Sequence, residues 1–198
     1  MTTHGRLGAY AARAAIFAVT LAVPSFANDA RADDTIKHPG DHPDYKVEVE
    51  PHVLLGWDDI FATGGLGVGG RFTIPIVHNG FIDSINNSVG IGFGMDLMHY
   101  ENCRYRGIGC SANYLYFPVV MQWNFYVHSA WSVFGEPGLF FYHGFLGDCG
   151  AGGPCDQPSV NGVRPALWIG GRYHISETVS LTMRIGWPAF SFGVSFFP

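Results

Sequence analysis

Histidine, serine and acidic residues near the ends of three chain segments have the types that nucleophilic catalysis requires. One segment ends at His99 with Glu101 just beyond it, Ser111 precedes the next segment, and His143 ends a third. A hydroxyl, an imidazole and a carboxylate within hydrogen-bond reach can act as nucleophile, base and orienting acid. These residues are separated along the chain, so only a fold that brings the segment ends together can assemble such a site.

A second set of acids and arginines recurs at alternate positions of segments that we interpret as strands. Alternate side chains of a strand point to one face, so these groups share one side of a sheet. We expect them to form ion pairs, because an unpaired charge away from water is costly and the planar fork of arginine satisfies a carboxylate at two points. Counting along the strands places Glu50 level with Arg71, and Glu136 level with Arg184. The full set is Glu48, Glu50, Arg71, Asp96, Glu136, Arg164, Arg172 and Arg184.

Four cysteines occur in two short stretches of the chain. They are Cys103 and Cys110, then Cys149 and Cys155. An even number of cysteines in an exported chain predicts disulfides. Three connectivities are possible, and we favour the two local pairs, Cys103–Cys110 and Cys149–Cys155. Zinc binding or redox chemistry would need CxxC spacing or nearby paired histidines, which are absent, so we expect no metal and no cofactor.

The first 45 residues predict an export signal followed by a tail. Residues 1–27 combine Arg6 and Arg13 with an apolar stretch and a small-residue cleavage site, which is typical of a secretory signal peptide. A membrane anchor is the alternative, but roughly ten apolar residues fall short of the ~20 that a spanning helix needs. Residues 28–45 are polar and acidic, and predict a flexible periplasmic tail.

The composition excludes several classes of protein. Charged residues make up 14% of the 198 residues, hydrophobic residues 47% and aromatic residues 15%, whereas soluble domains carry roughly 25% charged residues. So little charge is unusual for a cytosolic enzyme, and so much apolar residue excludes disorder for most of the chain. The net charge of −5 argues against nucleic-acid binding, which needs a basic face.

From residue 46 onward, apolar residues recur at every second position rather than at helical spacing. Phe190, Phe192, Val194 and Phe196 alternate with small residues, for example. Eight such segments predict an all-β fold, an eight-stranded antiparallel up-and-down barrel. The expected strands are 46–57, 65–76, 89–100, 113–126, 131–143, 164–175, 179–187 and 189–197.

The residue types on the polar face decide which side of the barrel points outward. A soluble barrel would also alternate, but its outer face would be rich in Lys, Glu and Thr. Here the polar positions are mostly Gly and Ser with isolated charges, while the other face is rich in Phe, Leu, Val and Ile. Small residues suit a narrow lumen and large apolar ones suit lipid. Residues 46–198 therefore predict a transmembrane β-barrel of the bacterial outer membrane.

Aromatic positions and connection lengths fit this orientation. Expected lipid-facing aromatics gather near segment ends, where rings prefer the headgroup region, although β propensity alone also places aromatics in strands. The connections at 101–112 and 144–163 are long and fall on one side, as external loops do. The expected interface aromatics are Trp57 and Trp187 at one end, and Trp123, Trp131 and Tyr173 at the other.

In its signal peptide, eight alternating strands, polar lumen and aromatic last strand, the chain resembles the small OmpA/OmpX-type outer-membrane barrel proteins. The resemblance implies insertion by the barrel-assembly machinery, although Pro198 follows the final aromatics. It implies contact with outer-membrane lipid and lipopolysaccharide, no nucleic-acid partner, and a monomer. Some similar barrels modify lipid A, but the His-x-Ser arrangement of lipid A deacylases is absent after His99 and His143, so we expect no enzymatic activity.

The sequence thus predicts a structural or interaction protein. Its lumen would be closed by paired charges, because eight strands leave an interior that side chains just fill. Its disulfide-bonded external loops would contact a partner. A narrow channel for small solutes and a lipid A-modifying enzyme remain the alternatives.

Overall fold

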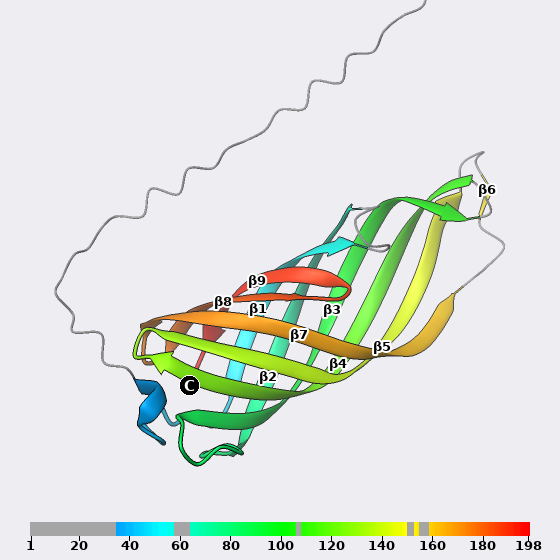
Figure 1. The fold of residues 1–198 in the computed structure, drawn as a ribbon. Helices are drawn as coiled ribbons and strands as arrows, with labels where there is room; N and C mark the ends of the chain where they lie inside the picture. The colour runs from blue at the N-terminus through cyan, green and yellow to red at the C-terminus, as the bar shows by residue number, and fades with distance from the viewer. Residues whose placement is uncertain (1–34, 58–63, 106–107, 150–152, 155–158) are drawn as a thin grey trace, which may run out of the picture. The chain divides into compact units, whose positions relative to one another are not determined.

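Eight long strands form one barrel in the computed structural model, which describes residues 35–57, 64–105, 108–149, 153–154 and 159–198 (Figure 1). All of them belong to one compact unit, Ala32–Pro198. A 3₁₀ helix, η1 (Thr35–Lys37), precedes the barrel, and the two-residue β6 (Gly153–Pro154) pairs with the end of β5. The barrel strands are β1 (Glu48–Trp57), β2 (Gly64–Val77), β3 (Asn87–Tyr105), β4 (Ile108–His128), β5 (Trp131–Cys149), β7 (Val160–Ser176), β8 (Val179–Gly186) and β9 (Ala189–Phe196).

The sheet closes on itself. Each barrel strand pairs antiparallel with the next one along the chain, and β9 pairs back onto β1 from Val49↔Phe196 to Gly56↔Ala189. Closure leaves no strand edge along the paired length. The predicted eight-stranded antiparallel up-and-down barrel is therefore confirmed. Among the described residues, no helix is long and apolar enough to cross a membrane.

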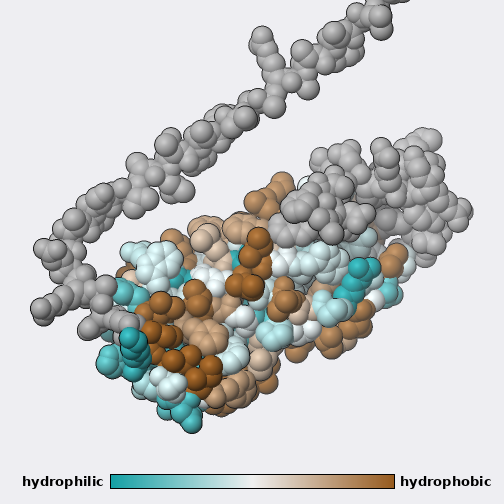
Figure 2. Space-filling view, in the orientation of Figure 1, coloured by the Kyte–Doolittle hydropathy of each residue, from teal (hydrophilic) through white to brown (hydrophobic). Residues whose placement is uncertain are grey.

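Apolar side chains cover the outside of the barrel. Leu66, Ile169 and Val53 are 67%, 63% and 53% exposed, while their neighbours on the other parity face the lumen. Figure 2 shows such side chains along the barrel wall. Exposing an apolar surface this extensive to water is unfavourable for a monomer, whereas contact of the same surface with lipid is favourable. The lipid-facing exterior that the sequence predicted is thus present.

Four strands are longer than predicted, all at the same end of the barrel, here called the extended end. β3 runs to Tyr105 and β5 to Cys149, while β4 begins at Ile108 and β7 at Val160. Most of the predicted loops 101–112 and 144–163 is therefore strand. Apolar alternation marks only lipid contact, so it stops where the backbone ladder continues beyond the lipid. In Figure 1 these strands extend past the β8–β9 hairpin.

Residues 35–45, here called the strap, differ from the predicted flexible tail. They pack on the opposite end of the barrel, here called the turn end. Thr35 Oγ1 donates to the Tyr126 carbonyl oxygen at 3.0 Å, and Asn86 Nδ2 donates to the Asp41 carbonyl oxygen at 2.7 Å. The His42 ring stacks on Tyr126, with ring centroids 4.3 Å apart. The polar composition of the strap gave no signal of these contacts, because they use backbone groups and barrel residues.

Tyr45 holds the strap where β1 begins. Its ring meets Phe197 edge-on with centroids 4.8 Å apart. Burial raises the pKa of the Tyr45 phenol well above its ordinary range, and nearby Tyr126 and Glu48 raise the pKa further. The phenol therefore stays neutral at physiological pH. The predicted signal peptide and the start of the predicted tail, residues 28–34, lie outside the described residues.

Candidate functional site

The centre of the lumen is an ion-pair network around Glu136. Its carboxylate accepts from Arg71 Nη1 at 3.1 Å, from Arg184 Nε at 3.1 Å and from Gln122 Nε2 at 2.8 Å. Arg184 also donates to Glu50. Glu136 is completely buried. Strands β1, β2, β4, β5 and β8 are thereby tied together across the barrel axis.

A second cluster lies nearer the turn end. Arg172 holds Glu48 with two hydrogen bonds, Nε to Oε1 at 3.0 Å and Nη2 to Oε2 at 2.6 Å, and its Nη1 donates to Asn124 at 2.7 Å. Ser195 Oγ lies 2.7 Å from Glu48 Oε1 and 3.1 Å from Glu50 Oε2. Ser195 therefore joins this cluster to the one around Glu136.

A third group lies towards the extended end. Asp96 Oδ2 is 3.7 Å from Arg71 Nη2, and Asp96 Oδ1 is 2.9 Å from His52 Nε2. The other ring nitrogen of His52, Nδ1, lies 3.4 Å from Glu50 Oε1. All these side chains are buried.

The pairing differs from the prediction at two positions. Glu50 and Arg71 face each other in the β1–β2 register, but in the described ion pairs Arg71 reaches Asp96 and Glu136 instead. Arg164 has lumen parity but is exposed. The β7–β8 pairing begins only at Trp168↔Gly186, so Arg164 lies beyond the end of β8. Its guanidinium sits over the Trp187 ring at 5.1 Å.

Aromatic side chains fill the lumen above the charges, and the sequence analysis missed them. Phe140 is fully buried, and Trp168 and Tyr116 are nearly so. Their parity was readable in the sequence, since Phe140 shares the inward face of β5 with Glu136. The sequence analysis considered aromatic residues only on the lipid-facing parity. The aromatic layer is formed by Tyr100, Tyr114, Tyr116, Phe140, Tyr142, Trp168 and Trp187.

Lumen glycines make room for these rings. Trp168 lies directly opposite Gly186, and a Cβ there would be 2.3 Å from the indole. Phe134 lies opposite Gly170 in the same way, with a Cβ distance of 2.1 Å. Real Cβ atoms do not come so close. The lumen-facing glycines are therefore needed because a ring from the adjacent strand lies across each of these two positions.

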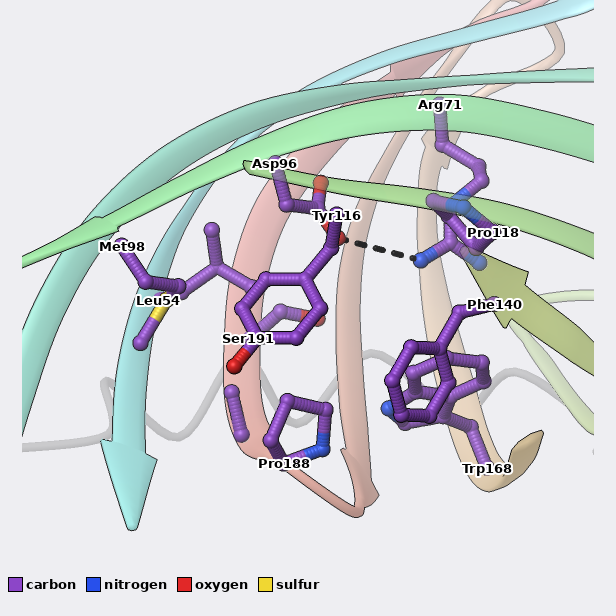
Figure 3. A pocket seen from close by; sticks show the side chains of 11 residues that line it. Leu54, Arg71, Asp96, Met98, Tyr116, Pro118, Phe140, Trp168, Pro188 and Ser191 are labelled. Carbon is purple, nitrogen blue, oxygen red and sulfur yellow. Dashed lines mark ion pairs between the residues drawn. The ribbon is translucent and has the colours of Figure 1, made fainter. Parts of the chain in front are cut away.

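A small cavity lies where the charged and aromatic layers meet, beside the Arg71 guanidinium that sits over the Trp168 ring at 5.2 Å (Figure 3). Arg71 and Asp96 lie on one side of it, and Phe140, Trp168 and Pro188 form walls. Its volume open to water is about 10 Å³, which is room for roughly one water molecule. Arg71 Nε is buried there without a hydrogen-bond partner among the described residues.

The predicted interface aromatics fall into different environments. Trp131 and Tyr173 are half exposed and pack together with centroids 4.8 Å apart. The Trp123 indole donates to Asn87 Oδ1 at 2.9 Å. Trp187 does not face lipid as predicted: it lies past the end of β8, next to a cis Pro188, and its ring packs on Phe140. The Trp57 side chain lies outside the described residues.

The possible catalytic residues are not joined to one another. His99 Nδ1 contacts Asn113 Oδ1 at 2.8 Å, and His143 contacts Asn161. In both cases the asparagine is the residue directly opposite on the neighbouring strand. Among the described side chains, Ser111 hydrogen-bonds neither histidine. The Glu101 side chain is not among those described. No group of three described His, Cys, Asp or Glu side chains is arranged to hold a metal.

The backbone register brings three cysteine positions together. Cys103 lies opposite Cys110 in the β3–β4 ladder, and Cys110 lies opposite Cys149 in the β4–β5 ladder. Cys155 lies outside the described residues. The sequence placed these cysteines in loops, whereas Cys103, Cys110 and Cys149 are in strands.

The closed barrel with an apolar exterior and a charged interior places the chain in the bacterial outer membrane. Antiparallel barrels with an even number of strands, a lipid-facing apolar band and a polar interior are the form in which β-structure spans that membrane. This is the location and the fold type that the sequence resemblance implied.

Among solved structures, the chain is similar to Ail, the attachment invasion locus protein of Yersinia pestis. The structures of Ail with the heparin analogue sucrose octasulfate and of Ail alone each show 11% identity and a TM-score of 0.43, covering 76% of this chain and 95% of Ail. Ail in a phospholipid bilayer nanodisc gives 11%, a TM-score of 0.35, and coverages of 75% and 97%. No family model and no curated protein matches the chain. A similarity of this size gives no information on function.

Proposed function

We propose that this outer-membrane barrel does not conduct solutes and acts as a structural or interaction protein. Its contact surface would be the extended end, where β3, β4, β5 and β7 continue beyond the lipid. The observation that carries this proposal is the ion-pair network centred on Glu136, which crosses the lumen between strands on opposite walls. We place the extended end outside the cell, because outer-membrane barrels have short periplasmic turns and longer external connections.

An ion entering this lumen would have to separate buried charge pairs. Breaking such a pair leaves an uncompensated charge in a poorly solvated space, which costs about 3–5 kcal/mol. Above the pairs, Phe140 and Trp168 offer no charged group and no acceptor oxygen to a hydrated cation. Charge pairs and aromatic rings together support a closed lumen rather than a charged filter.

Conductance across a planar bilayer tests the proposal. The purified barrel should give no steady single-channel current. Glu136→Ala should introduce unstable openings, because it leaves Arg71 and Arg184 without their shared partner, whereas Glu177→Ala at the exposed β7–β8 turn should stay silent. A uniform conductance step in the unaltered protein would overturn the closed-lumen proposal in favour of a narrow channel.

The extended end would be held by disulfides. Directly opposite residues of an antiparallel pair have Cα atoms about 4.5–5.5 Å apart, within the range of a disulfide. The β3–β4 register therefore supports Cys103–Cys110, which leaves Cys149 for Cys155. Peptide mapping under non-reducing conditions tests this, and a Cys110–Cys149 link would contradict it.

The remaining expectations form part of the same proposal. The mature chain would begin after residue 27, be inserted by the barrel-assembly machinery, and stay monomeric among outer-membrane lipid and lipopolysaccharide. We propose no enzymatic activity, since the cross-strand asparagines occupy His99 and His143. Lipid A that changes in mass when His99→Ala replaces the unaltered protein would contradict this.

A further inference from the structure

The buried charges of the lumen do not balance when only acids and arginines are counted. Among the described residues, the buried carboxylates are those of Glu48, Glu50, Asp96 and Glu136. The buried guanidinium groups are those of Arg71, Arg172 and Arg184. Four negative charges thus face three positive ones. Because an uncompensated buried charge is costly, a fourth cation is expected close to the acids.

His52 occupies the place where that cation is needed. It projects from β1 between Asp96 of β3 and Glu50 of its own strand, and it is 5% exposed. Nε2 lies 2.9 Å from Asp96 Oδ1, and Nδ1 lies 3.4 Å from Glu50 Oε1. Nε2 is thus hydrogen-bonded to one carboxylate, whereas Nδ1 lies within ion-pair distance of the other without a hydrogen-bond partner among the described residues.

Only one protonation state of the ring suits both neighbours. A neutral imidazole has one N–H donor and one lone pair, so one nitrogen would direct its lone pair at a carboxylate. An imidazolium presents a proton on both nitrogens. We infer that His52 is protonated inside the barrel and serves as the fourth cation of the lumen.

The other charged groups around His52 are already engaged. Arg71 on β2 reaches His52 only through Asp96, at 3.7 Å from that carboxylate. Arg184 on β8 contacts Glu50 and Glu136. Neither arginine forms a hydrogen bond with His52. The two arginines therefore stabilise the Asp96 and Glu50 carboxylates but do not supply the positive charge that His52 would place between them.

The two strands beside β1 pack closely against His52 and its carboxylates. A Cβ on Gly69 of β2 would lie 2.2 Å from Asp96 Oδ1 and 2.7 Å from His52 Nε2. A Cβ on Gly193 of β9 would lie 2.7 Å from the His52 Cβ and 3.0 Å from Glu50 Oε1. Both adjacent strands therefore approach as closely as glycine allows, so neither position could supply a cationic side chain in place of His52.

A second lumen histidine provides the contrast. His174 near the turn end has Ser132 Oγ 3.0 Å from Nε2 and Ser180 Oγ 2.8 Å from Nδ1. Hydroxyl groups can donate or accept, so a neutral ring satisfies both partners. Arg172, two residues away along the same face of β7, disfavours a second positive charge there. We therefore expect His174 to be neutral where His52 is charged.

Nitrogen NMR of the barrel in lipid nanodiscs, with ¹⁵N-labelled histidine, tests the inference directly. At pH 7.5 His52 should show two protonated ring nitrogens, and His174 one. Correlation of each ring with its own backbone amide assigns the signals in the unaltered protein, so the measurement does not depend on a variant that folds. A His52 ring with a single proton at this pH would overturn the inference.

Charge-balance variants give a second measurement. His52→Gln leaves four acids against three arginines and should lower the unfolding temperature. Adding Asp96→Asn to it restores three against three and should recover part of that loss. His174→Gln with Asp96→Asn is the matched control and should show no such recovery. If Asp96→Asn destabilises both backgrounds equally, His52 carries no charge.

This inference deepens the proposed closed lumen but can fail separately from it. Conductance reports whether ions pass, and NMR reports where the proton resides. A silent barrel with a neutral His52 would refute only the fourth cation, while a conducting barrel with a charged His52 would refute only the closed lumen.

Discussion

Single glycines decide how the lumen packs. Gly170 faces inward beneath Phe134, and the Phe134 ring in turn lies under two arginines, with the Arg172 and Arg184 guanidinium carbons 4.2 and 4.9 Å from the ring centroid. The adjacent Gly171 faces lipid, where an added Cβ would meet only the Ser132 carbonyl oxygen at 3.7 Å. Two neighbouring glycines thus have different roles.

Gly170→Ala should destabilise the barrel by about 1–3 kcal/mol, the usual cost of overpacking. The new Cβ would lie 2.1 Å from Phe134 Cζ and 2.7 Å from the Met183 carbonyl oxygen, and the backbone oxygen cannot move aside cheaply. Urea unfolding in lipid vesicles measures the effect. Gly171→Ala is the control and should change the unfolding free energy by less than about 0.5 kcal/mol. Equal effects at both sites would refute the packing role of Gly170.

At the scale of elements, the strap and the β2–β3 connection hold each other. Asn86 of that connection donates its backbone N–H to the Ile36 carbonyl oxygen at 2.8 Å, and the His42 ring contacts the His78 carbonyl oxygen at 3.0 Å. Periplasmic turns are usually shorter than the β2–β3 connection. The extra length of this connection therefore has a structural role here. The strap covers the turn end of the barrel through these contacts.

Tyr45→Ala should release the strap and increase trypsin cleavage after Lys46 in the purified barrel several-fold. The strap of the unaltered protein should itself loosen as the pH rises. The pKa of the buried phenol is raised, so its docking energy is fully present below its ordinary pKa of about 10 and is lost as the pH rises through its raised value.

His38→Ala, an exposed change in the same segment, is the control and should leave cleavage unchanged. If Tyr45→Ala is cut no faster than His38→Ala, the ring does not hold the strap.

At the scale of the whole molecule, the apolar exterior of the barrel is suited to a lipid surrounding. On β7, Leu167 and Ile169 lie midway along the apolar face, while Ile175 lies one residue from the strand end. A charge therefore has very different surroundings at these positions, although their exposure is similar.

Ile169→Arg should lower the unfolding free energy in lipid vesicles by about 2–4 kcal/mol, and Ile175→Arg by about 0–1 kcal/mol. The difference arises because an arginine near the strand end reaches the headgroups while one at mid-height does not. Both side chains are largely exposed in the barrel itself, 63% and 59%, so the contrast reports lipid depth. Equal losses at the two sites would contradict the orientation of the apolar belt.

The sequence alone determined the barrel, its strand count and the face that meets lipid. Alternation is a local property of the sequence. The residue types on each face of a strand directly indicate whether that face prefers lipid or the lumen. It also placed Glu136 and Arg184 at one depth, where the structure has them 3.1 Å apart. The alternation of the strands also gives the inward positions of the aromatic layer, although the sequence analysis did not include these residues in the lumen.

Only the tertiary structure decided which charges meet and where the lumen ends. Arg71 pairs with Glu136 on the far wall rather than with its register neighbour Glu50. Side chains in a narrow barrel pair across the axis, and the sequence of a single strand does not give the distance between opposite walls. Arg164 is exposed because β8 stops short of it. The strap likewise depends on carbonyl groups that become available only once the barrel has closed.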